Sequence, residues 1–214
     1  MRIRNTVAHY ADNIKYDTAY QFGVFNGDSL FDIANLFKRK NKPLNHLFGF
    51  DSFIGFPEND GRQSDWSTGS LNTCEHLGVN TIEECVDVIY KKVTPGLQPE
   101  TKLELIPGFF SDVLTKENVQ KYNMGPAAYI DIDCDLYESA IECLEFVVQN
   151  GILQPGTLIW YDDWGGTEGW DEYRDGEPRA HKEISDKYNI ESTLLLQIGD
   201  SSPHIQRLYI VKKY

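Results

Sequence analysis

Short runs of apolar residues alternate along the chain with longer segments in which apolar residues recur every three or four positions. The short runs are typical of buried strands, and the longer segments are typical of amphipathic helices. Strands are predicted over residues 19–25, 46–51, 102–106, 127–133, 157–161, 192–197 and 207–211. Helices are predicted over residues 28–40, 81–93, 111–122, 136–150 and about 178–188.

This alternation predicts an α/β fold, doubly wound, with a mainly parallel seven-stranded sheet and helices on both faces. Only residues 199–204 separate the last two strands, so these should pair as a C-terminal antiparallel hairpin. We expect one domain over residues 1–214, with an N-terminal extension at 1–18 and active-site loops at 52–80 and 164–177.

Composition excludes several function classes. The chain has 33 acidic and 20 basic residues and a formal net charge of −13, which disfavours nucleic acids and anionic membrane surfaces as partners. No apolar stretch approaches the roughly 20 residues of a membrane span, and the N-terminus does not resemble a signal peptide. Cys74, Cys85, Cys134 and Cys143 form no Cys-x-x-Cys pair, so reduced thiols and a cytoplasmic location are expected.

Ligands of such sheets bind beyond the carboxyl ends of the strands. The first strand ends in a Gly-x-x-x-Gly turn, Gly23 to Gly27, directly before a predicted helix, and this spacing fits either a cofactor turn or an ordinary tight turn. Asp51 ends the second strand, where it would bind a ribose or form an Asx turn. Gly108 and Phe109 follow the third strand and would contact an adenine ring, the alternative for the phenylalanine being core packing.

Carboxylates gather where the next two strands end. Asp131, Asp133 and Asp135 follow one another at every second position, and Asp162 and Asp163 end the fifth strand. Like charges so close destabilise one another unless a cation offsets them, and an all-oxygen cluster selects Mg²⁺, Mn²⁺ or Ca²⁺. A metal site is therefore the main hypothesis, and a solvated acidic patch is the alternative.

Five segments together carry a family resemblance: residues 22–29 (FGVFNGDS), 49–57 (GFDSFIGFP), 107–114 (PGFFSDVL), 133–139 (DCDLYES) and 155–163 (PGTLIWYDD). In these segments the chain resembles the macrocin O-methyltransferase (TylF-like) family of class I, Rossmann-like, S-adenosylmethionine-dependent methyltransferases. The resemblance extends from about Tyr20 to Ile184. It implies methylation of a hydroxyl on a sugar or glycosylated small molecule.

The resemblance also implies roles for individual residues. Asp133, Asp162 and Asp163 match the family's Mg²⁺ ligands, and Asp135 matches its general base. The implied contacts to S-adenosylmethionine come from the residues that end the first four strands: Gly23, Asn26, Gly27, Ser29, Asp51, Ser52, Gly108, Phe109 and Asp133.

Some positions depart from the family pattern. Gln21 stands where methyltransferases commonly carry an acid, and Cys134 replaces a glycine within the acidic motif. Trp164 and Trp170 would form an acceptor wall or pack internally. The alternative functions are a catechol-type phenol O-methyltransferase and a catalytically silent cofactor-binding module. The sequence is compatible with a monomer and with a homo-oligomer.

Overall fold

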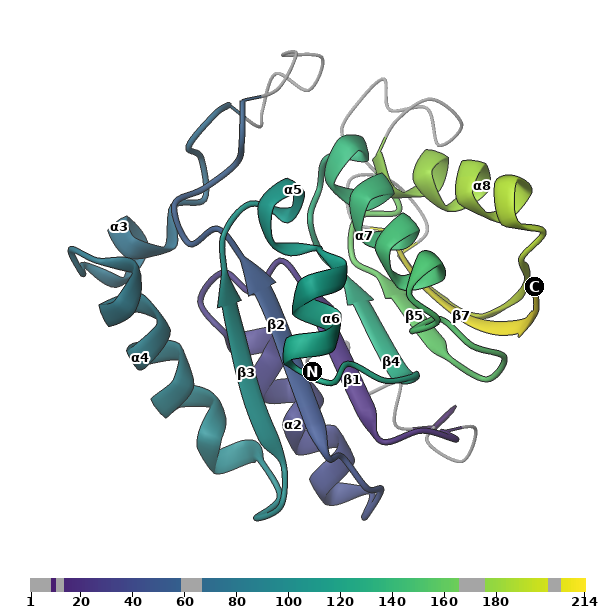
Figure 1. The fold of residues 1–214 in the computed structure, drawn as a ribbon, viewed down its shortest axis with the longest axis horizontal. Coiled ribbons are helices and arrows are strands. Elements are labelled where there is room, and N and C mark those ends of the chain that lie inside the picture. The colour runs from purple at the N-terminus through teal and green to yellow at the C-terminus, as the bar shows by residue number, and fades with distance from the viewer. Residues whose placement is uncertain (1–8, 11–13, 59–66, 166–175, 200–204) are drawn as a thin grey trace.

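Seven strands form one sheet in the order β3-β2-β1-β4-β5-β7-β6 (Figure 1). In the computed structural model, which describes residues 9–10, 14–58, 67–165, 176–199 and 205–214, β7 is antiparallel to both of its neighbours and the other pairs are parallel. The predicted fold class and C-terminal hairpin are thus confirmed. The strands are β1 (Thr18–Phe22), β2 (His46–Asp51), β3 (Lys102–Pro107), β4 (Ala127–Ile132), β5 (Leu158–Tyr161), β6 (Glu191–Ile198) and β7 (Gln206–Lys213).

Helices cover both faces of this sheet (Figure 1). One face packs against α2 and α4, and the other packs against the helices that follow β3, β4 and β5. None of the helices in the described ranges is long and apolar enough to cross a membrane. The helices are α2 (Asp28–Arg39), α3 (Thr73–Leu77), α4 (Ile82–Val93), α5 (Phe110–Val113), α6 (Lys116–Lys121), α7 (Tyr137–Gln149) and α8 (Gly176–Tyr188).

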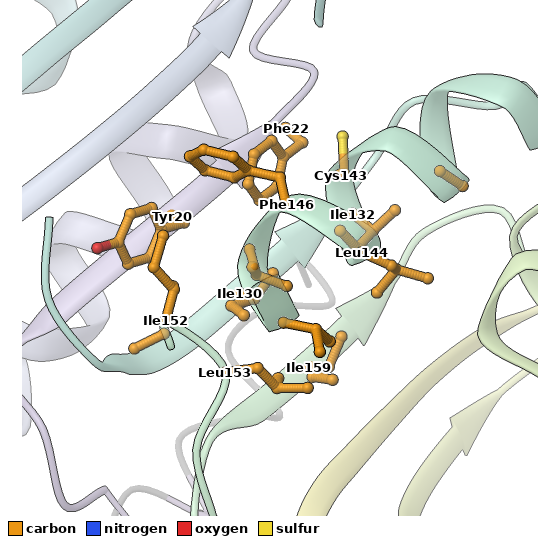
Figure 2. Packing of buried hydrophobic residues seen from close by; sticks show 14 of the residues in the cluster. Tyr20, Phe22, Ile130, Ile132, Cys143, Leu144, Phe146, Ile152, Leu153 and Ile159 are labelled. Carbon is orange, nitrogen blue, oxygen red and sulfur yellow. The ribbon is translucent and has the colours of Figure 1, made fainter. Parts of the chain in front are cut away.

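Each face of the sheet has its own apolar core. On the α7 face, side chains of β1, β4 and β5 meet those of α7, and Figure 2 shows Phe22, Ile132 and Phe146 within this layer. The rings of Phe22 and Phe50 stack with centroids 5.1 Å apart, so the two neighbouring strands are also joined through their aromatic side chains. Burial of these large groups is the main favourable contribution to folding, and it holds the carboxyl ends of the parallel strands at one edge.

The predicted helix ends are largely found where the local chemistry places them. Thr81 caps α4 through a capping box with Glu84, and Gly151 takes the left-handed conformation (φ 66°) just after α7. The prediction of one helix over residues 111–122 is wrong. Thr115 is extended and its hydroxyl accepts a hydrogen bond from the Asn118 amide (3.2 Å), so it ends the run and starts α6 as a cap.

Candidate active site

A cavity of about 470 Å³ opens at the carboxyl edge of the sheet, within the size range of small-molecule sites. It is bordered by the segments that follow β1, β2, β3 and β4, and by Asp163 after β5. Every predicted cofactor residue except Gly27 borders it: Gly23, Asn26, Ser29, Asp51, Ser52, Gly108, Phe109 and Asp133. The topology therefore gathers residues from four separate motifs around one space.

Gly23 allows the turn after β1 to touch the loop after β4. Its φ is +88°, and a Cβ at this position would lie 1.8 Å from the carbonyl oxygen of Asp133. The Asp133 amide donates to the Phe22 carbonyl (3.0 Å), and the Gly23 amide donates to the Phe50 carbonyl (2.9 Å). Only glycine satisfies both the backbone conformation and this close approach.

Gly27 has a structural position behind the cavity. It lies at the N-terminal end of α2 with φ +80°, and a Cβ there would lie 2.8 Å from the side chain of Ile89. The absent side chain lets α2 begin close against α4. From α4, Lys92 donates to the Asn26 carbonyl (2.9 Å) and forms an ion pair with Asp28 (2.8 Å), so a lysine outside the motifs also holds this turn.

Asp51 holds the backbone of two segments at the cavity, the turn after β1 and the loop after β2. One carboxylate oxygen accepts hydrogen bonds from the amides of Val24 and Phe25 (2.8 Å each), and the other accepts one from Phe53 (2.7 Å). The bond to Phe53 is the Asx turn considered as an alternative to ribose binding, and the carboxylate still borders the cavity. Burial raises the pKa of Asp51, and the three amide hydrogen bonds counteract this rise.

These bonds also hold strained backbone in place. Phe25 and Phe53 have φ values of +45° and +60°, which side chains other than glycine rarely adopt. The surrounding structure must supply the free energy that such conformations cost. The carboxylate of Asp51 bonds the amides of both residues, so it supplies part of that energy.

Two residues of the acidic motif, Asp133 and Asp135, border the cavity together with Asp163 from the segment that ends β5. Asp135 is half-buried and has a left-handed backbone with φ +59°. Burial and the charge of Asp133 raise its pKa to about 7, with Asp162 adding to the rise and a hydrogen bond with Asp163 counteracting it. A carboxyl group that titrates near neutral pH at a cavity wall is suited to taking or giving a proton.

Asp162 is oriented differently from the other acids of the cluster. Its Oδ1 atom accepts hydrogen bonds from Trp160 Nε1 (3.0 Å) and Gln206 Nε2 (2.7 Å), and the residue does not border the cavity. Among the residues that the structure describes, no group of three or more His, Cys, Asp or Glu side chains is arranged to hold a metal ion. The donor chemistry nevertheless suits a hard divalent cation, because the oxygens are carboxylates whose mutual repulsion a cation would relieve.

Glu177 is a site residue that the sequence motifs do not include. It is fully buried at the start of α8, and its two oxygens accept hydrogen bonds from the amides of Cys134 (3.4 Å) and Asp163 (3.0 Å). Burial and the nearby charge of Asp163 raise the pKa of Glu177 well above its usual range. No local pattern marks it, because its partners lie 43 and 14 positions away in the sequence.

Trp164, which follows β5, packs inside the protein. Trp164 is only 5% exposed, and its ring packs against Tyr161 and Tyr209 with centroids 5.1 and 5.2 Å away. It does not border the cavity, so the structure favours the packing alternative over an acceptor wall. Trp170 lies outside the described residues.

The departure at Gln21 lies away from the cavity. This residue is fully buried in β1, between Gly49 of β2 and Asp131 of β4, and it does not border the cavity. Within the described part of the chain, its amide group has no hydrogen-bond partner. Asp131, which shares the alternation of the acidic motif, is also fully buried in the sheet.

Comparison with known proteins points to one family. The chain matches the model of the macrocin-O-methyltransferase (TylF) family over residues 3–190. A search of curated proteins gives no match.

Among solved structures, the chain is similar to CalS11, a calicheamicin methyltransferase, with 20% identity, 94% of this chain and 76% of that chain covered, and a TM-score of 0.62. For the O-methyltransferase NovP the values are 16% identity, 98% and 79% coverage, and a TM-score of 0.69. TomG from Streptomyces achromogenes, in complex with S-adenosylmethionine, is 11% identical, with 98% of this chain and 79% of that chain covered and a TM-score of 0.58. These similarities show a shared fold.

The contact at Gly23 predicts a large difference between two glycine substitutions. Gly23→Ala should lower the free energy of unfolding by about 2–4 kcal/mol, because the new methyl group meets a backbone carbonyl and the left-handed backbone is strained. Gly78 also has a positive φ (+67°) but has nothing within 4 Å of its added Cβ. Gly78→Ala should therefore lower the free energy of unfolding, measured in urea, by only about 1 kcal/mol. Equal losses for the two variants would contradict the close contact.

The carboxylate cluster predicts a pH-dependent stability of the metal-free protein. Because the folded-state pKa of Asp135 is about 7 and the unfolded value about 4, its contribution to stability is present at acidic pH and is lost as pH rises towards 7. Asparagine tolerates the left-handed backbone and does not titrate. As pH rises from 5 to 8, the free energy of unfolding of Asp135→Asn should therefore increase by about 1–3 kcal/mol relative to that of wild type. Urea unfolding with a chelator present measures this difference.

The matched control is Glu100→Gln, which changes an exposed carboxyl group. It should leave the pH dependence of unfolding unchanged. The same pH dependence in Asp135→Asn as in wild type would show that this carboxyl group is not perturbed in the folded protein.

Proposed function

The chain belongs to the macrocin O-methyltransferase family, and we propose that it transfers a methyl group from S-adenosylmethionine to a hydroxyl of a sugar or glycosylated small molecule. The observation that carries the proposal is the cavity at the sheet edge, where the cofactor-motif residues of four strands meet the acidic motif. One similar structure, CalS11, is described as a TDP-rhamnose 3'-O-methyltransferase. The proposal takes the chain as one domain in the cytoplasm, with active-site loops at residues 52–80 and 164–177.

The residues around the cavity suit S-adenosylmethionine. Gly23 and Asn26 would border its methionine part near the start of α2, where Ser29 also lies. Asp51 and Ser52 would bind the ribose hydroxyls, and the backbone at Gly108 and Phe109 would contact the adenine. Bound in this way, the cofactor supplies a methyl group that its sulfonium charge already activates.

A divalent cation forms part of the proposal. Asp133, Asp162 and Asp163 would hold it, Asp162 through a carboxylate that Trp160 and Gln206 already orient. Mg²⁺ or Mn²⁺ suits carboxylate oxygens best, and Ca²⁺ shares this preference. Such an ion would lower the pKa of the acceptor hydroxyl and fix its position.

Asp135 is the proposed general base. A sugar hydroxyl is a weak nucleophile because its pKa lies far above neutral, so a group that removes its proton during the transfer speeds the reaction. Asp135 borders the cavity, and its left-handed backbone is a strained conformation of the kind that gathers at functional sites. Asp163, whose interaction with Asp135 lowers the pKa of that carboxyl group, borders the same cavity.

Cofactor binding predicts the behaviour of Asp51→Ala. Loss of a charge-assisted contact to the ribose should weaken binding of S-adenosylhomocysteine by roughly 10- to 150-fold in calorimetry. The variant should also unfold at lower urea concentration, since the amides of Val24, Phe25 and Phe53 lose their acceptor. Asp87→Ala, which removes an exposed carboxylate on α4, should match wild type in both measurements. Tight binding of NAD and none of S-adenosyl compounds would contradict the assignment.

The roles of the carboxylates predict different effects on turnover. Asp135→Asn should bind S-adenosylhomocysteine normally but transfer methyl groups about 10²–10⁴-fold more slowly, because the amide cannot take a proton. Asp163→Asn should lose activity together with affinity for Mn²⁺, measured by calorimetry.

Excess EDTA should abolish wild-type turnover on a panel of glycosides. Full activity in EDTA would refute the metal role, and wild-type turnover in Asp135→Asn would refute the base.

A further inference from the structure

Glu177 is a buried acid placed between the two loops that carry the acidic cluster. It belongs to the first turn of α8 and is 0% exposed. The loops in question follow β4 and β5, which pair in parallel up to Ile132 and Tyr161. Both loops therefore leave the sheet at the same edge, with the helix end beside them.

The contacts of Glu177 join these loops through their backbones. One carboxyl oxygen accepts a hydrogen bond from the Cys134 amide at 3.4 Å, and the other accepts one from the Asp163 amide at 3.0 Å. Cys134 is the residue between Asp133 and Asp135, so the first bond fixes the centre of the acidic motif. The second bond fixes the backbone of an acid that itself borders the cavity.

A carboxyl group at this position lowers the stability of the folded protein more than an ordinary structural contact would. A carboxyl group buried near Asp133 and Asp163 experiences both desolvation and like charge. A neutral side chain such as glutamine offers one acceptor oxygen, whereas the two oxygens of a carboxyl group bond both amides at once. Joining both amides, a contact that we call the bridge, thus requires a carboxyl group at a position where burial and neighbouring charges disfavour its ionised form.

We propose that Glu177 is a positioning residue, which holds the Asp133–Asp135 loop and Asp163 in the arrangement that methyl transfer requires. This inference rests on the proposed function for its catalytic consequence, and its structural part is independent of that function. Glu177 does not border the cavity, so it would act through the backbone of Cys134 and Asp163, which do.

Amide hydrogen exchange measured by NMR tests the bridge without reference to activity. In Glu177→Ala, the amides of Cys134 and Asp163 should exchange at least about tenfold faster than in wild type, since both lose their acceptor. The amides of Val24 and Phe25, which bond to Asp51, should exchange at the wild-type rate. Unchanged exchange at Cys134 and Asp163 would overturn the proposal.

Glu177→Gln is the second variant, in case the alanine variant does not fold. Its single acceptor oxygen should keep one of the two amides protected and expose the other, and protection of both would overturn the bridge. Glu183→Gln is the matched control, because Glu183 lies on the same helix but is exposed, and it contacts the side chains of Arg179 and Tyr137. It should change neither exchange nor turnover.

Kinetics then tests the positioning role. The glutamine variant should lose about tenfold or more in kcat, while acceptor KM, affinity for S-adenosylhomocysteine and melting temperature stay close to wild type. A kcat that falls only in proportion to the folded fraction would overturn the role. If wild type itself transfers no methyl group, the proposed function fails, and the exchange measurement still decides whether the bridge exists.

Discussion

The close approach of β1 and β4 at their carboxyl ends is the contact on which the rest of the site depends. The carbonyl of Asp133 lies where a side chain at position 23 would be, and the Asp133 amide bonds the carbonyl of Phe22. The turn beside the cofactor motif and the loop with the carboxylates are thus packed backbone to backbone. Two halves of the cavity are assembled through this contact, since a larger residue at Gly23 would separate them.

The acidic cluster is held together against its own repulsion. Asp135 combines a left-handed backbone with a pKa raised by burial and by neighbouring charges, and both features reduce stability. The apolar layers on the two faces of the sheet offset this cost, with fully buried rings such as Phe22, Phe50 and Trp160 directly below the rim. A strained and charged edge on a well-packed sheet is a common arrangement for catalysis, because the packing keeps reactive groups in place.

Much of this organisation is predictable from sequence for physical reasons. Periodicity identifies the strands, and parallel topology brings the residues that end them to one edge, so the sequence alone predicts Gly23, Asp51 and Asp133 at that edge. The contacts of Glu177 span 43 and 14 positions and leave no local pattern. The break at Thr115 is not predictable in this way, because a threonine within an apolar periodicity fits either a helix or a cap.

The orientation of Asp162 shows a further limit of motif-based prediction. Its partner Gln206 comes from β7, which reaches the site only because that strand inserts next to β5. The acids of the rim therefore serve two purposes that the sequence does not distinguish: some border the cavity, and others hold donors of the protein itself. Asp51 does both, whereas Glu177 only holds loops. The oxygens of a carboxylate can accept about four hydrogen bonds, so Asp51 holds three backbone amides and still has acceptor capacity at the cavity, whereas the two amide bonds of Glu177 keep the walls of the cavity in place from behind.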